Sequence, residues 1–182
     1  MAGKIGALGW NAHGGTVSPI EAVAVPGKGE LVFTGNVGRT GQDAAKVAFS
    51  CLRARGEALG IERQLATHDL HLHYVDTELA KDGPSAGLAL ALAGYAAYAG
   101  KPLREALAAT GEITLQGAVR PVGGLHEKLV ASYLAGVERV LVPRKNLHEV
   151  ARVPDEVRAR LTIVHVDTLG EALEHAVASP SE

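Results

Sequence analysis

The chain passes from an extended segment into an apolar run at Lys81-Asp82-Gly83-Pro84-Ser85-Ala86-Gly87, and the run continues from Leu88 to Ala99. Gly83 permits backbone angles that other residues avoid, and Pro84 suits the first turn of a helix, so Ser85 is predicted to sit where a helix begins. Free backbone N–H groups at such a position can bind an anion. Two interpretations fit this pattern: Ser85 is a displayed nucleophile, or it is only the cap of the helix.

A second helix downstream carries a lysine on its apolar face. Leu125, Lys128, Leu129 and Ser132 are spaced so that they share one side of a helix. Burial disfavours the charged form of a lysine and lowers its pKa, and a neutral lysine amine is a general base. The alternative is that Lys128 reaches solvent from the edge of the helix.

Hydrophobic periodicity along the rest of the chain predicts an α+β fold, with a mixed sheet and packed helices. We expect a single domain over residues 1–178 and a frayed tail over residues 179–182. Strands are predicted over Ile5 to Trp10, Val17 to Val25, Leu31 to Thr34, Leu70 to Val75, Arg139 to Pro143 and Leu161 to Val166, and further helices over Gly41 to Leu59, Gly124 to Ala135, Asn146 to Val150 and Thr168 to Val177.

Composition and charge exclude several classes of partner. Of the 182 residues, 47% are hydrophobic and 21% are charged, which is the balance of a globular protein with one substantial core. The formal net charge is −2 and no basic stripe is present, so we expect no nucleic-acid partner. The longest apolar run is too short to span a bilayer and no signal peptide is found, so we expect no membrane partner and a cytoplasmic location.

Three motifs, in the right order and spacing, resemble the proteolytic domain of Lon proteases. They are Lys81-Asp82-Gly83-Pro84-Ser85-Ala86-Gly87, Thr110-Gly111-Glu112-Ile113-Thr114-Leu115 and Pro121-Val122-Gly123-Gly124-Leu125-His126-Glu127-Lys128-Leu129. The likeness extends over nearly the whole chain, including Leu70-His71-Leu72-His73 and Val140-Leu141-Val142-Pro143. The resemblance implies the Lon proteolytic fold, which is of the ribosomal S5 domain 2-like class.

The resemblance also implies a Ser–Lys dyad. In this interpretation Ser85 is the nucleophile and Lys128 is the base that takes its proton. Supporting roles are implied for Thr110, whose hydroxyl bonds the lysine, and for Asp82, which shapes or gates the loop before the nucleophile. Glu21 matches a position that is linked to the active site in this family.

The implied reaction is hydrolysis of peptide bonds through an acyl-enzyme, with unfolded proteins and peptides as substrates and a homo-hexameric ring as the assembly. No metal or other cofactor is implied for this chain. Lon proteases usually carry an AAA+ unfoldase ahead of the proteolytic domain, but no G-x-x-x-x-G-K-[ST] occurs in this sequence. ATP would therefore act only through an absent AAA+ module, and the chain is either an excised domain or a peptidase that works apart from its ATPase.

Three other interpretations stay open. His71 and His73 share a strand face with Asp69 and Asp76 nearby, which suggests a metal site, although no third ligand has a convincing spacing. A Ser–His–Asp hydrolase is possible in principle, because the chain has eight histidines. The third is a non-catalytic Lon-like assembly or interaction domain, although such relatives lack the serine and the lysine.

Overall fold

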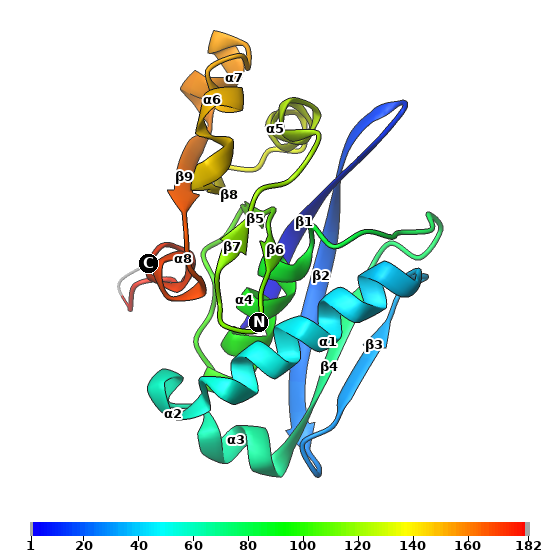
Figure 1. The fold of residues 1–182 in the computed structure, drawn as a ribbon, viewed down its shortest axis with the longest axis vertical. Coiled ribbons are helices and arrows are strands. Elements are labelled where there is room, and N and C mark those ends of the chain that lie inside the picture. The colour runs from blue at the N-terminus through cyan, green and yellow to red at the C-terminus, as the bar shows by residue number, and fades with distance from the viewer. Residues whose placement is uncertain (1, 181–182) are drawn as a thin grey trace.

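A mixed seven-stranded sheet runs through the molecule, and the computed structural model that shows it describes residues 2–180 (Figure 1). β1–β2 and β2–β4 are antiparallel pairs, whereas β3–β4, β1–β5, β5–β8 and β8–β9 are parallel. The predicted α+β fold with a mixed sheet is confirmed. In spatial order the strands are β3 (Leu31–Thr34), β4 (His68–Tyr74), β2 (Gly14–Pro26), β1 (Gly3–Asn11), β5 (Leu107–Ala109), β8 (Arg139–Pro143) and β9 (Thr162–Val166), and a separate ribbon contains β6 (Glu112–Ile113) and β7 (Val119–Arg120).

Helices cover both faces of the sheet. They are α1 (Arg39–Ala54), α2 (Gly56–Leu59), α3 (Glu62–Thr67), α4 (Gly87–Ala99), α5 (Leu125–Leu134), α6 (Leu147–Val150), α7 (Asp155–Arg160) and α8 (Leu169–Ala176), with a short 3-10 helix at Arg144–Asn146. Within residues 2–180, no helix has both the length and the apolar character needed to cross a membrane.

Alternation along the central strands sends neighbouring residues into two different hydrophobic cores. Leu141 of β8 enters the core that is covered by α1, α4 and α8, whereas Val140 and Val142 enter the core beneath α5, α6 and α7. The same alternation separates Ala109 from Ala108 on β5. Neighbouring residues at the end of β5 therefore pack against helices on opposite faces of the sheet.

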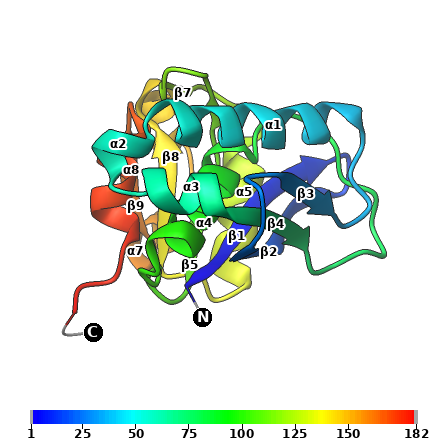
Figure 2. The same ribbon diagram turned by 90° about the horizontal axis from the view of Figure 1, so that it is seen from below.

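The apolar run from Leu88 to Ala99 forms the most deeply buried helix, α4. Residues from Gly87 to Ala96 of α4 are all buried, and α4 lies beneath α1 in the middle of the molecule (Figure 2). A helix that is apolar on every side is stable only when it is surrounded by protein. This burial fixes the N-terminal end of α4, and with it the segment that carries Ser85.

Several short elements differ from the prediction. The helix predicted over Gly41 to Leu59 is divided at Arg55 into α1 and α2. The short elements β5, α3 and α7 are not predicted, because their few residues show no clear alternation or helical period. The division into one domain over 1–178 stays a prediction, and residues 181 and 182 of the expected frayed tail lie outside the described residues.

We predict that Leu90→Ala destabilises the protein strongly. Leu90 is 1% exposed within α4, so its truncation leaves a cavity that costs about 2–5 kcal/mol of unfolding free energy. Urea denaturation measures the loss. Leu134→Ala is the matched control, because Leu134 is 76% exposed and its truncation should change stability by less than about 0.5 kcal/mol. Equal losses in the two variants would contradict the central position of α4.

Candidate active site

Ser85 lies in a turn just before α4 rather than in the helix. The N-cap residue is Ala86, and no side chain caps this end of α4, so the interpretation of Ser85 as a helix cap is wrong. Gly83 has the positive φ of 105° that the sequence suggested. The N–H of Gly87 donates to the carbonyl of Pro84 at 3.2 Å, which closes the turn and leaves Ser85 half-buried.

The end of β5 holds this turn through its backbone. The N–H of Gly111 donates to the carbonyl of Ser85 at 2.8 Å, and the N–H of Leu88 donates to the carbonyl of Gly111 at 2.9 Å. A Cβ built on Gly87 would lie 3.0 Å from Cγ2 of Ile113, so a side chain at this position would crowd the contact. The position of Ser85 is therefore tied to the strand end by two backbone hydrogen bonds.

Lys128 is buried on α5 as its spacing predicts. The buried residues of this helix are Leu125, Lys128, Leu129 and Ser132, and Lys128 is 1% exposed. The alternative in which Lys128 reaches solvent is wrong. Its Nζ donates to Oγ1 of Thr110 at 3.1 Å, and Thr110 is fully buried at the end of β5 on the side of Ala108.

Burial lowers the pKa of Lys128 from 10.5 to about 8, and the nearby Glu149 carboxylate acts in the opposite direction. A buried ammonium loses its hydration, so the neutral amine is favoured. A substantial fraction of this lysine is therefore deprotonated near pH 8, which is the state a general base requires.

Ser85 and Lys128 line one pocket of about 260 Å³, together with Trp10, Asp82 and Glu112. In the part of the chain that the structure describes, Lys128 bonds Thr110 and makes no hydrogen bond to Ser85. A second pocket of about 210 Å³ also reaches Ser85 and is lined in part by Leu79. The serine thus stands where two pockets meet, and one of them contains the amine.

Asp82 lines both pockets, but its carboxylate is engaged elsewhere. Oδ1 of Asp82 accepts a hydrogen bond of 2.8 Å from the N–H of Gly41, in the first turn of α1. Backbone N–H groups, first that of Gly41 and then that of Gly83, lower the pKa of this carboxyl. The N-cap of α1 is Gly38, which has no side chain to cap the helix, so Asp82 supplies the cap and ties the serine loop to α1.

The sequence of the whole chain matches one protein family. Residues 1–179 match the sequence model of the Lon protease (S16) C-terminal proteolytic domain. The chain belongs to the Lon protease family. This is a family of serine peptidases, and the resemblance predicted from the three motifs is confirmed.

Curated Lon proteases resemble this chain along almost all of its length. The chain is 43% identical over 175 residues to Lon protease 1 of Thermus thermophilus, 39% identical over 181 residues to the Lon protease of Haemophilus influenzae, and 41% identical over 176 residues to that of Escherichia coli. These matches cover 96%, 99% and 96% of the chain. The chain spans 22% of the length of each relative, which corresponds to the proteolytic part of a longer Lon protein.

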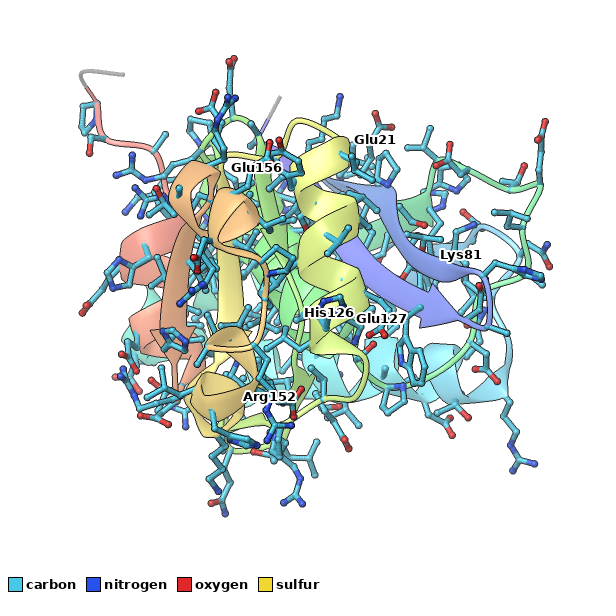
Figure 3. All side chains as sticks on the ribbon, turned by 90° about the horizontal axis from the view of Figure 1, so that it is seen from above. Glu21, Lys81, His126, Glu127, Arg152 and Glu156 are labelled. Atoms are coloured by element: carbon cyan, nitrogen blue, oxygen red, sulfur yellow. The ribbon has the colours of Figure 1, made fainter. Side chains whose placement is uncertain are left out.

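Glu21 is not brought to the pocket of this Lon proteolytic domain. It lies on β2 opposite Lys4 of β1 and His73 of β4, and it lines neither of the two pockets that reach Ser85. Figure 3 shows Glu21 at the end of α5 that is opposite to His126 and Glu127. Glu21 matches a family position that is linked to the active site, but in this structure it does not line the pockets of Ser85 and Lys128.

His71 and His73, which the sequence suggested as metal ligands, both lie within hydrogen-bonding distance of the Thr34 hydroxyl. Oγ1 of Thr34 is 2.9 Å from Nε2 of His71 and 2.7 Å from Nδ1 of His73. The Asp69 carboxylate accepts hydrogen bonds of 2.8 Å from the N–H groups of Lys28 and Glu30. Within residues 2–180, no group of three or more His, Cys, Asp or Glu side chains is placed to hold a metal ion.

Asn146 contacts a segment that borders the pocket, although no sequence motif points to it. It is 2% exposed, its Oδ1 accepts from the N–H of Val122 at 3.0 Å, and its Nδ2 donates to the carbonyl of Val122 at 2.9 Å. Val122 lines the pocket with Lys128, so Asn146 fixes the segment that leads into α5. An uncharged polar residue three positions after the buried strand β8 was the available signal.

We predict that the buried lysine makes stability depend on pH. Because the pKa of Lys128 is about 8 in the folded state and 10.5 in the unfolded chain, the unfolded state binds more protons between these values. The unfolding free energy of the wild type, relative to Lys128→Met, should therefore rise by about 3 kcal/mol as the pH passes from 8 to 10.5. Urea denaturation of both proteins over this range measures it, and a constant difference would contradict the burial of an ionisable amine.

Proposed function

We propose that this chain hydrolyses peptide bonds, with Ser85 as the nucleophile and Lys128 as its general base. One observation carries the proposal: a buried lysine, held by Thr110 and paired with no carboxylate in the described residues, opens on the same pocket as a serine in a turn. A serine hydroxyl is a weak nucleophile at neutral pH and needs an adjacent base. Membership of the Lon family supports this assignment.

The reaction begins when the neutral Lys128 amine takes the Ser85 proton while Oγ attacks the carbonyl carbon of the substrate. The Lys128 ammonium then protonates the leaving amine as the C–N bond breaks, and an acyl-enzyme ester remains. Water attacks this ester with Lys128 again as the base, and the acid product leaves with Ser85 restored. Thr110 orients the amine, because its hydroxyl accepts a hydrogen bond from Nζ and leaves the Nζ lone pair for Ser85.

The oxyanion of the tetrahedral intermediate needs backbone donors. The N–H groups of Gly87 and Leu88 already bond the carbonyls of Pro84 and Gly111, so they are not the donors. We assign this role to the N–H groups of Ser85 and Ala86, which come earlier in the turn. Such donors contribute about 3–4 kcal/mol to catalysis.

The substrates we propose are unfolded proteins and peptides, cleaved by a homo-hexamer in the cytoplasm. The relatives are more than four times as long as this chain, which leaves room for the AAA+ unfoldase that the family resemblance implies. ATP dependence would come from that module as a partner, and the chain itself would need no cofactor. Folded proteins would then be resistant to the isolated chain.

We predict that Ser85→Ala and Lys128→Ala each lower kcat/KM for an unfolded substrate by about 10⁴-fold or more, since each removes a reacting group. A fluorogenic peptide assay measures this, together with labelling by a fluorophosphonate that Ser85→Ala should abolish. Ser50→Ala and Lys46→Ala are matched controls, because both residues are exposed on α1. If Ser85→Ala retains hydrolysis, the dyad is wrong, and inactivity of the wild type towards every unfolded substrate would favour the non-catalytic alternative.

We predict that the pH dependence of kcat/KM follows the ionisation of Lys128. Only the neutral amine accepts the serine proton, so kcat/KM should rise with pH and level off above the Lys128 pKa of about 8. Initial rates of peptide cleavage between pH 6 and 10 give the profile. A rate that does not change with pH between 7 and 9 would exclude Lys128 as the base.

A further inference from the structure

The closed end of the β1–β2 hairpin lies directly against α5, the helix that carries Lys128. In Figure 1 this hairpin extends as a long ribbon beside α5, and contacts between β2 and α5 confirm the approach. Trp10 and Gly15 are paired residues at this end of the hairpin. Both of them touch the N-terminal half of α5 or the turn before it.

Gly15 brings two backbones together without a side chain between them. A Cβ built on Gly15 would lie 2.1 Å from the carbonyl oxygen of Glu127 and 3.0 Å from Cβ of Ala131. Glu127 immediately precedes Lys128 in α5. Any outward movement of this turn of the helix, or any atom added to Gly15, therefore changes the position of the lysine backbone.

Trp10 holds the turn before α5 from the other side. A Cβ built on Gly124 would lie 2.3 Å from Cγ of Trp10, so the indole rests on this glycine. Gly124 is the N-cap of α5 and has a φ of 66°, which glycine adopts without strain. Trp10 itself is 54% exposed, and it lines both pockets that reach Ser85.

We propose that Trp10 is a positioning residue for Lys128: together with Gly15 it clamps the first turns of α5, so that the lysine amine stays in the pocket of Ser85. The catalytic consequence rests on the proposed function of Lys128. The effect of the clamp on the position and solvation of the Lys128 amine can be tested without measuring catalysis.

The charged groups around Lys128 are separate from the clamp. Asp82 and Glu112 line its pocket, Glu149 of α6 acts on it through charge, and His126 and Glu127 precede it on α5. Figure 3 shows His126 and Glu127 at the N-terminal end of α5. Replacing Trp10 removes none of these charges, so any change in the titration of Lys128 would come from altered position or from water entry.

The test compares Trp10→Ala, Trp10→Phe and Gly15→Ala with two controls. Leu134→Ala truncates another exposed apolar side chain, on α5 itself. Gly170→Ala is the matched glycine control, because the nearest atom to a Cβ built there is 3.9 Å away. NMR titration of the lysine ¹³Cε signals in a Ser85→Ala background reports the Lys128 pKa without activity, and peptide assays in the active background give kcat and KM.

Water that enters after Trp10→Ala should raise the Lys128 pKa from about 8 towards 10.5, and each unit of this rise lowers the neutral fraction near pH 7.5 about ten-fold. We expect kcat to fall accordingly, with KM nearly unchanged. Trp10→Phe should restore most of the rate, Gly15→Ala should lower kcat, and both controls should match the wild type.

Unchanged Lys128 titration and kcat in both Trp10→Ala and Gly15→Ala would overturn the clamp. A general loss of stability with an unshifted pH profile and no rescue by Trp10→Phe would overturn it as well. Failure of the proposed function has a different signature, namely activity that survives in Lys128→Ala. In that case the NMR titration still decides whether Trp10 positions the lysine.

Discussion

The site depends on two adjacent residues at the end of β5. The Thr110 hydroxyl accepts the hydrogen bond from Lys128, and the Gly111 backbone exchanges hydrogen bonds with the turn that carries Ser85. Ser85 and Lys128 are thus both held at the end of one short interior strand of the sheet. A shift of this strand end would move both groups together, which keeps their relation to each other.

The two hydrophobic cores explain why Ser85 and Lys128 come from opposite faces of the sheet. Ser85 precedes α4, which packs on one face of the sheet, and Lys128 projects from α5 on the other face. Because side chains alternate along β5, Thr110 faces α5 while its neighbours pack towards α4. The strand end is therefore the place where the two layers can present a serine and an amine to a common pocket.

Burial gives Lys128 its chemistry and also imposes a cost on the fold. An amine of pKa about 8 is still largely charged at neutral pH. The folded state therefore contains a buried ammonium group, whose desolvation lowers the free energy of unfolding. The segments around the amine are held by packed helices and by contacts to backbone groups. Such contacts join Asp82 to the first turn of α1, Asn146 to Val122, and Gly15 to Glu127. Each contact constrains a segment that borders the pocket.

The buried faces of the long elements follow from the order of residues along the chain. The apolar run of α4, the buried face around Lys128 and the three Lon motifs could be recognised because each depends on neighbours within a few residues. Three relations became visible only once the chain was folded: Asp82 caps α1 across 41 residues, Asn146 holds Val122, and Glu21 lies away from the pocket. These relations depend on strand order and on close backbone approach, and neither leaves a periodic signal in the chain.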